Sequence, residues 1–363
     1  MAIIDPFPTI AQLAAETGEK WEGFSMAAEG TARAETKLKD ALKTDSSKNR
    51  IPDANDALVL FVSFARHEML EGSDYDWAVL VDGVASSSQA QQAQAISTAL
   101  AQAKLIKPGR SGTFGVAISS HDLVHYIGGA DDSNANFTRR ILLLLESRYL
   151  ELAPSSASKR IWENVIKSIL KRYFEEDVHF RPGSHRVPRF LLNDITRYWR
   201  TVCVDYAAKH WQQGGQKWAL RNAKIRLSRK LLYAAGLAFC FDCYLRHPVR
   251  AHGKMTSGAQ PFIQYALQFT KTPPLEYLAS FIKRNIANKR KRIQVARRVF
   301  GSYNQWLLLM NDKETRKALN KLSHSQAPKN LHFERIRDIG STFAQGLREL
   351  FLTENTTMIQ SLT

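Results

Sequence analysis

The sequence predicts an α/β core with a small mixed sheet, followed by a larger all-α lobe. Two short apolar runs, residues 58–62 and 77–81, have the length and composition of buried strands. A third strand is expected within residues 112–120, and helical patterns alternate with these strands, which is typical of an α/β unit. Strand patterns nearly disappear after about residue 127. We therefore expect three parts, at residues 1–50, 51–127 and 128–363.

Apolar periodicity and turn residues place the remaining elements. One helix is expected over residues 8–43, and the Ala-, Gln- and Ser-rich segment 86–105 should form another. Asp82-Gly83 and Pro108-Gly109 mark turns. In the third part the pattern predicts helices at 134–152, 158–175, 188–211, 215–246, 260–270, 274–310 and 330–353.

Composition indicates a globular, basic, cytoplasmic protein. Its hydrophobic content is 44%, its formal net charge is +17 and its pI is about 9.8, so polyanionic partners such as nucleic acid or nucleotides are favoured. Three cysteines fit a reducing compartment, and Cys240 and Cys243 lie in an apolar run that favours buried thiols over a metal site. That run, residues 231–245, is too short to span a bilayer, and the N-terminus does not resemble a signal peptide. We expect no membrane association.

Two aspartates stand where the second apolar run begins. In an extended segment, residues i and i+2 share a face, so Asp74 and Asp76 should point together while Tyr75 points to the other side. Such a pair suits two Mg²⁺ ions about 3.5–4 Å apart, which activate an attacking oxygen and hold the leaving group in phosphoryl or nucleotidyl transfer. An isolated Asp-x-Asp pair, however, more often simply begins a strand.

The residues around this pair form a wider pattern. The preceding turn runs from Val62 to Met69 as VSFARHEM and is followed by SDYDW at 73–77, and the segment LLESR at 144–148 comes about 70 residues later. These ordered motifs resemble the nucleotidyltransferase module of the DNA polymerase beta superfamily. The likeness is to the branch of the PII uridylyltransferases, whose turn reads G-G-[aromatic]-G-R-x-E-[apolar]. Val62 and Ala65 depart from the family glycines.

The resemblance implies a nucleotidyltransferase core at 51–127 that uses Mg²⁺, or alternatively Mn²⁺, and an NTP or dNTP. Asp74 and Asp76 would bind the metal ions, and Ser63, Arg66 and Ser73 would contact the nucleotide. The chain would transfer a nucleoside monophosphate to an acceptor hydroxyl and release pyrophosphate.

The position of a third metal carboxylate is open. The superfamily normally carries it on a later strand, but residues 113–119 contain no acid. Asp122 and Asp82 are the candidates, although for Asp122 a role as the cap of a following helix is favoured. Without a third carboxylate, a degenerate, non-catalytic domain becomes a serious alternative to an enzyme.

Basic residues in the helical part are the next candidates. By resemblance, residues 128–363 form a substrate-binding domain whose cations contact the triphosphate, and Lys217, Arg221 and Lys224 share one predicted helical stripe. A solvated basic face is the alternative for these three residues.

The run 283–298 contains eight basic residues in sixteen and no acid. On one helix, Ile286, Ile293 and Val295 would form a partly apolar side while the charges face solvent. Polyanion binding is favoured over a solvated surface, and the ligand could be an oligonucleotide product, a tRNA acceptor or duplex DNA. The basic residues are Lys283, Arg284, Lys289, Arg290, Lys291, Arg292, Arg297 and Arg298.

The favoured acceptor is a nucleotide or nucleic-acid 3′-hydroxyl because of the net charge and the basic run. Stand-alone bacterial nucleotidyltransferases of this type include signal-making enzymes of anti-phage defence, such as those that resemble the Hailong systems. Two alternatives stay open. One is a protein-modifying nucleotidyltransferase with a partner protein as acceptor, and the other is a degenerate nucleic-acid-binding module.

Overall fold

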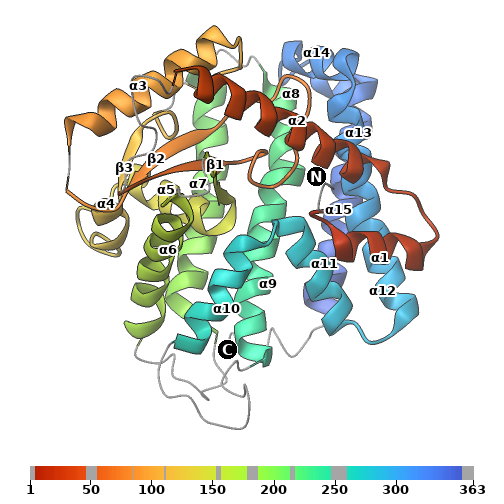
Figure 1. Ribbon diagram of the computed structural model, residues 1–363. Helices are drawn as coiled ribbons and strands as arrows, with labels where there is room; N and C mark the ends of the chain where they lie inside the picture. Colours follow the sequence, from red (N-terminus) through yellow and green to blue (C-terminus); the bar gives the residue numbers. More distant parts are fainter. Residues whose placement is uncertain are drawn as a thin grey trace. The chain divides into compact units, whose positions relative to one another are not determined.

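The protein is mostly helical, with one small four-stranded mixed sheet in its N-terminal part and a largely helical region after it (Figure 1). This confirms the predicted α/β core and the helical lobe at this coarse level. The computed structural model describes residues 5–45, 55–84, 86–109, 112–152, 157–177, 187–212, 217–246 and 260–353.

The chain divides into two compact units, each assembled from separate stretches. The sheet unit comprises Ala28–Ser184 and His247–Pro273. The helical unit comprises Met1–Ala27, His185–Arg246 and Pro274–Thr363. Residues 128–184 thus belong with the sheet, whereas the expected division at residue 50 lies outside the described residues.

The sheet has the strand order β3-β2-β1-β4. β1 pairs antiparallel with β2 and with β4, and β3 pairs parallel with β2. Every residue of β1 and β2 is buried, as expected for continuous apolar runs covered on both faces. The strands are β1 Asp56–Phe61, β2 Trp77–Val81, β3 Ala117–Ser119 and β4 Ser147–Tyr149.

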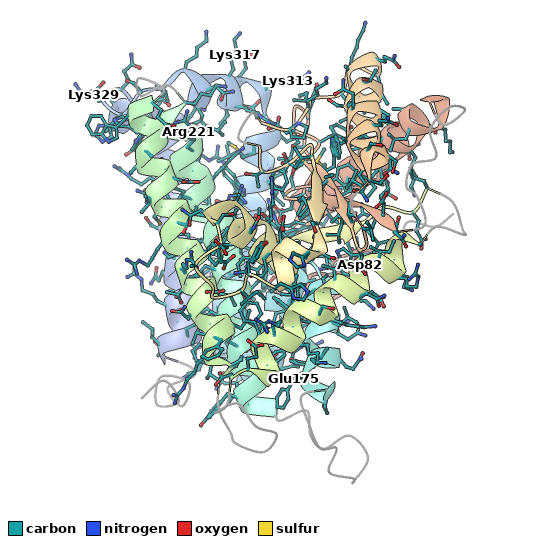
Figure 2. All side chains as sticks on the ribbon, turned by 90° about the vertical axis from the view of Figure 1, so that its left-hand side faces the viewer. Asp82, Glu175, Arg221, Lys313, Lys317 and Lys329 are labelled. Carbon is teal, nitrogen blue, oxygen red and sulfur yellow. The ribbon has the colours of Figure 1, made fainter. Side chains whose placement is uncertain are left out.

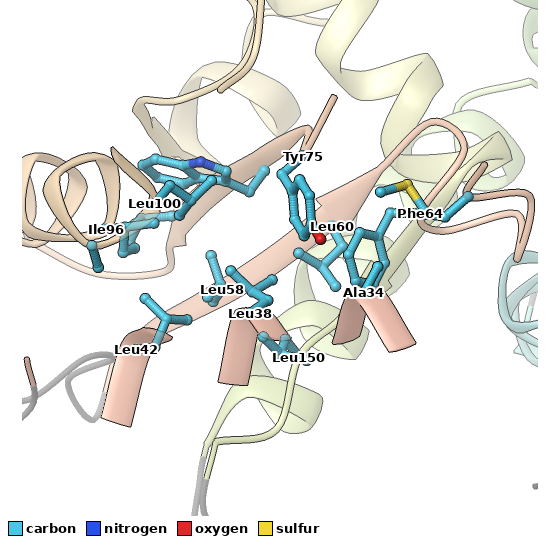
Figure 3. Packing of buried hydrophobic residues seen from close by; sticks show 14 of the residues in the cluster. Ala34, Leu38, Leu42, Leu58, Leu60, Phe64, Tyr75, Ile96, Leu100 and Leu150 are labelled. Carbon is cyan, nitrogen blue, oxygen red and sulfur yellow. The ribbon is translucent and has the colours of Figure 1, made fainter. Parts of the chain in front are cut away.

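Helices cover the sheet of this unit. On one face, α2 and α3 contribute apolar residues at helical spacing, such as Leu38 and Leu42 or Ile96 and Leu100, to a cluster with Leu58 of β1 (Figure 3). Burial of each such leucine contributes roughly 1.5–3 kcal/mol. α6 packs against β1 and β2. The helices of the unit are α2 Glu22–Asp45 (which begins in the helical unit), α3 Ser87–Gln102, α4 Ser120–Val124, α5 Asn134–Leu145, α6 Ser158–Glu175 and α10 Gln260–Lys271.

The helical unit contains no strand among its described residues. Its long helix α15 packs against π-helical turns, and a Cβ at Gly346 would meet the backbone and side chain of Val299, so glycine permits this close approach. The α-helices are α1 Pro8–Thr17, α7 Arg189–Gln212, α8 Trp218–Lys224, α9 Lys230–Arg246, α11 Pro274–Asn285, α12 Lys289–Ala296, α13 Ser302–Asn311, α14 Lys313–Lys321 and α15 Leu331–Arg348. The other helical turns are η1 Ile225–Arg229, η2 Arg297–Gly301, η3 Ala327–Lys329 and η4 Glu349–Thr353.

Three predicted helices differ from the observed elements. The helix predicted over 8–43 is interrupted at Gly18, whose φ of 72° ends α1. The helix predicted over 134–152 stops at Leu145, because the next residues pair with β1 as strand β4. The helix predicted over 274–310 is broken at 286–288, where the Asn288 side chain caps α12.

The buried thiols are confirmed: Cys240 and Cys243 lie fully buried in α9, and burial raises the pKa of both. Across the described ranges, none of the helices has both the length and the apolar character that crossing a bilayer requires.

Candidate active site

The backbone holds Asp74, Tyr75 and Asp76 in an extended segment that leads into β2. The Phe61 amide donates to the Asp76 carbonyl over 2.9 Å, which extends the β1–β2 ladder by one residue. On the edge of this segment that faces away from β1, the Tyr75 amide donates to the Ile106 carbonyl over 2.9 Å. Successive residues are therefore bonded to opposite sides, as in a strand.

The two aspartates face away from the hydrophobic cluster. Tyr75 is only 7% exposed and lies in that cluster, where its ring meets the Phe64 ring edge-on at 5.7 Å (Figure 3). Because alternate residues of an extended segment take opposite faces, Asp74 and Asp76 share the other face. Asp74 is exposed and Asp76 is half-buried. Two carboxylates so placed offer the hard oxygen ligands that Mg²⁺ prefers.

The turn after β1 places Ser63 two residues beyond the partner of Asp76. Val62 and His67 have left-handed φ angles of 57° and 59°, and the Glu68 amide donates to the Ser63 carbonyl over 2.8 Å. Val62 thus occupies a conformation that favours glycine, the residue type at the matching family position. The half-buried Ser63 hydroxyl lies 3.3 Å from the Met69 sulfur and would have to leave this contact to bind phosphate.

Ser73 closes a tight turn just before the aspartates. Its hydroxyl accepts a hydrogen bond from the Leu70 amide and its own amide donates to the Leu70 carbonyl, both over 3.1 Å. Gly72, with a φ of 72°, allows this turn. The observed contacts of Ser73 therefore position Asp74.

Arg66 is not available to a nucleotide, in contrast to the prediction. It is 4% exposed, and its guanidinium pairs with Glu68 at 2.9 Å and with Glu146. The two buried carboxylates compensate the positive charge of the guanidinium. Arg66 stays with them, because breaking a buried ion pair leaves an uncompensated buried charge. The structure therefore gives Arg66 a positioning role in the turn.

The two sequence motifs meet in the sheet unit. Glu146 reaches Arg66 of the first motif, and the Ser147 hydroxyl accepts a hydrogen bond from the Trp162 indole over 2.8 Å. Arg148 lies over the Phe64 ring at 5.5 Å from its centroid and pairs with Glu35 of α2 at 2.8 Å. The LLESR segment thus stabilises the turn after β1, which lies next to the aspartates. Sequence reasoning found both motifs but not this contact between them.

Two titratable groups beside this contact have shifted pKa values. Burial acts to raise the pKa of Glu35, but Arg148 and Lys39 outweigh burial, and the pKa is lowered. Burial lowers the pKa of His67 to about 4, and the positive charge of Arg148 acts in the same direction. His67 is therefore neutral at physiological pH.

Neither candidate for the third carboxylate, Asp82 or Asp122, lies beside Asp74 and Asp76. The segment 112–119, which leads into β3 and contacts Trp77 through the Gly115 amide at 2.7 Å, contains no acid. Asp82 follows the far end of β2, roughly 20 Å from Asp76 at the rise of an extended strand, and accepts a hydrogen bond from Ser120. Among the described residues, no group of three or more histidine, cysteine or acidic side chains is placed to hold a metal ion.

Asp122 lies in the first turn of α4, which Ser119 caps. Because Ser119 pairs with Val81, α4 begins at the same end of β2 as Asp82. The interpretation of Asp122 as the helix cap is therefore wrong, because Ser119 caps α4 and Asp122 is an acidic residue within its first turn.

Arg139 is a cation that the sequence did not single out. From α5 it donates to the Gly112 carbonyl over 2.6 Å and to the Thr113 carbonyl over 3.2 Å, which fixes the segment leading into β3. Its charge also interacts with Asp122. No sequence pattern identifies this role, since its partners are backbone carbonyls.

The three basic residues of the helical unit that were predicted to contact the triphosphate lie on α8 or just before it. Lys217 and Lys224 are exposed and Arg221 is half-buried. These residues belong to the helical unit, whereas Asp74 and Asp76 belong to the sheet unit. Their proposed contact with a triphosphate stays a prediction.

Five of the eight basic residues in the run 283–298 form ion pairs or hydrogen bonds within the helical unit. Arg284 pairs with the buried Asp242, and Lys283 donates to the Gln12 side chain. The remaining ion pairs are Arg292–Glu16 at 3.0 Å, Arg297–Glu19 at 3.1 Å and Arg298–Glu349. The exposed residues Lys289, Arg290 and Lys291 begin α12, and an open groove of about 620 Å³ is lined by Lys289, Arg290, Ile293, Gln294, Arg297 and Arg298.

Comparison with protein-family models, with curated proteins and with solved structures gave no match to this chain.

Proposed function

We propose that this protein is a magnesium-dependent nucleotidyltransferase whose metal ligands are Asp74 and Asp76. The observation that carries the proposal is the extended Asp74–Asp76 segment, whose carboxylates share the face away from the core. The meeting of the two motifs around Arg66 and Glu146 supports it, because that contact fixes the turn beside the aspartates.

The substrate is an NTP or dNTP, and the acceptor is a nucleotide or nucleic-acid 3′-hydroxyl. Mg²⁺ or Mn²⁺, when bound, supplies charge stabilisation for the attacking and leaving oxygens. Asp74 and Asp76 hold the ions, and the turn at Ser63 lies next to the segment that carries them. The chain needs no covalent nucleophile for this chemistry. The net charge of +17 supports a polyanionic acceptor.

The first experiment compares two aspartate variants of the purified protein. Each labelled NTP and dNTP is incubated with Mg²⁺ and protein and resolved on a denaturing gel. We expect a nucleotide-specific ladder that D74N/D76N reduces by at least about 100-fold, since loss of the metal ions removes several kcal/mol of transition-state stabilisation. D82N is the matched control and should retain wild-type activity, because Asp82 lies at the other end of β2.

The pattern of label separates the alternatives. Label that stays on a protein band after denaturation supports a protein acceptor. If D82N abolishes incorporation as completely as D74N/D76N does, the assignment of the metal ligands is wrong.

A second candidate function is a degenerate nucleic-acid-binding module. The absence of any acid in residues 112–119, which run beside β2, favours it, because the superfamily normally carries a third carboxylate on a later strand. No incorporation by the wild-type protein, even with cell extract as a source of acceptors, together with nucleic-acid binding that D74N/D76N leaves intact, would establish this function instead.

A further inference from the structure

Two segments of the helical unit carry many cations and no carboxylate. Between Asp205 and Asp242 the chain has seven lysines and arginines and no acidic residue. Between Glu314 and Glu334 it again has no acidic residue. The basic residues of the first segment are Lys209, Lys217, Arg221, Lys224, Arg226, Arg229 and Lys230, and those of the second are Arg316, Lys317, Lys321 and Lys329.

The fold brings these two segments together. The Trp218 ring of α8 meets the His324 ring edge-on at 4.8 Å, and the Ala219 amide donates to the Leu322 carbonyl over 3.5 Å. α8 also packs against α14 and α15. Figure 2 shows Arg221 of α8 and the labelled lysines of α14 and η3 at the same end of the helical unit.

The lysines of this surface are available to a ligand. Lys317, Lys321 and Lys329 are exposed, and no carboxylate within the described part of the chain pairs with them. This distinguishes them from the arginines of the run 283–298, four of which are held by carboxylates of the same unit. Unpaired, exposed ammonium groups bind phosphate oxygens without first breaking an internal ion pair.

An exposed tryptophan borders the same surface. Trp211, near the end of α7, is 81% exposed, and its ring is 5.5 Å from that of His210. The His210 ring is in turn 6.0 Å from that of His324. An exposed indole contributes little hydrophobic stabilisation to the folded chain. Next to these basic residues, however, it offers an aromatic face on which a base can stack.

We propose that this α8–α14 surface, comprising Trp211, Lys217, Arg221, Lys317, Lys321 and Lys329, binds single-stranded nucleic acid. The lysines contact the phosphates, and an unpaired base stacks on Trp211. A single strand is favoured over a duplex because only an unstacked base exposes a face to an indole. The proposal is independent of the proposed nucleotidyl transfer, since it requires neither Asp74 nor Asp76.

The test measures fluorescence anisotropy of labelled single-stranded DNA, single-stranded RNA and duplex DNA with the full chain in EDTA. We expect K317E/K321E/K329E to weaken single-strand binding at least about tenfold and to reduce the salt slope by about 0.7 for each phosphate that the variant no longer neutralises. K20E/K37E/K159E has the same change in net charge at exposed lysines elsewhere and should bind nearly as wild type. Equal weakening by both triple variants would overturn the proposal.

Tryptophan variants test the stacking contact. W211A should weaken single-strand binding about fivefold or more, and W211F, which retains an aromatic face, should recover most of the affinity. Folding of each variant is checked by circular dichroism. Unchanged affinity of W211A, or duplex binding as tight as single-strand binding and equally sensitive to W211A, would overturn the stacked single-strand mode. D74N/D76N should bind as wild type, so failure of the catalytic assignment leaves this result intact.

Discussion

At the scale of single residues, His67 in the turn after β1 makes the free energy of unfolding depend on pH. Its half-buried imidazole lies near the positive charge of Arg148, and desolvation together with that charge lowers its pKa from 6.5 to about 4. As the pH falls from 6.5 towards 4, the unfolded chain binds a proton at this residue while the folded chain does not. The contribution of His67 to the free energy of unfolding is therefore present above pH 6.5 and is lost as the pH falls through this window.

We expect H67N to flatten the pH dependence of stability between pH 6.5 and about 4. Asparagine removes the titrating group and tolerates the left-handed φ of 59° at this position. The difference in slope corresponds to at most about 3 kcal/mol over the window. Urea unfolding at a series of pH values measures it. A wild-type curve as flat as that of H67N would show that His67 titrates normally in the folded protein.

Residue spacing was sufficient to predict the shared face of Asp74 and Asp76, because alternation in a strand is a local property. The role of Arg66 was not predictable in this way. Its partner Glu146 lies 80 residues away, and nothing local distinguishes a cation that pairs with a carboxylate from one that binds phosphate. For the same reason Arg139, whose partners are backbone carbonyls, was missed.

At the scale of elements, the connection from β1 towards β2 is strained at its first residue. Val62 is β-branched and has a φ of 57°, a conformation that costs an L-residue about 1–2 kcal/mol. Ala65, the other departure from the family glycines, does not have a positive φ. Glycine would therefore relieve backbone strain at position 62 but not at position 65.

We expect V62G to be at least as stable as the wild type, because relief of the strain offsets the greater freedom of glycine in the unfolded chain. A65G should lose about 0.5–1 kcal/mol, since it adds that freedom without relieving strain. Guanidinium unfolding of the two variants compares them directly. Equal destabilisation by both substitutions would contradict the assigned strain.

Local patterns predicted the long helices well and the sheet edge poorly. Residues 158–175 form α6 as predicted, because a strong amphipathic stripe determines such a helix. Residues 147–149 were predicted as the end of a helix, yet they form β4 because the edge of β1 offers unpaired backbone groups to them. Pairing with a distant strand overrides local preference here.

At the scale of the whole molecule, the two compact units are interleaved along the chain. The sheet unit takes residues 28–184 and a second stretch, 247–273, whereas the helical unit takes three stretches. Composition and motif order predicted a sheet-bearing core before a helical part, but they gave no signal for this interleaving. The contacts that define it join residues far apart in sequence, such as Lys271 and Glu163 at 2.8 Å.

A fragment spanning residues 128–363 should not fold cooperatively. It keeps β4 and α6 but lacks β1, their partner in the sheet, so the apolar residues that pack on β1 would be exposed. We expect a broad, weak thermal transition by circular dichroism and strong binding of a hydrophobic dye, compared with a sharp transition for the full chain. A cooperative transition in the fragment would instead support an independent helical domain at 128–363.

The first helix of the chain has its hydrogen-bonding partner far downstream. The Thr9 amide donates to the Glu276 carboxylate over 2.8 Å, across 267 residues of sequence. At roughly 5–20 residues per second, a ribosome needs about 15–50 s to reach Glu276 after it has made Thr9. Throughout that interval the apolar face of α1 is without α11, and residues 28–184 of the sheet unit are synthesised before α11 is. Nascent-chain quality control would therefore encounter α1 without its partner until α11 has been synthesised.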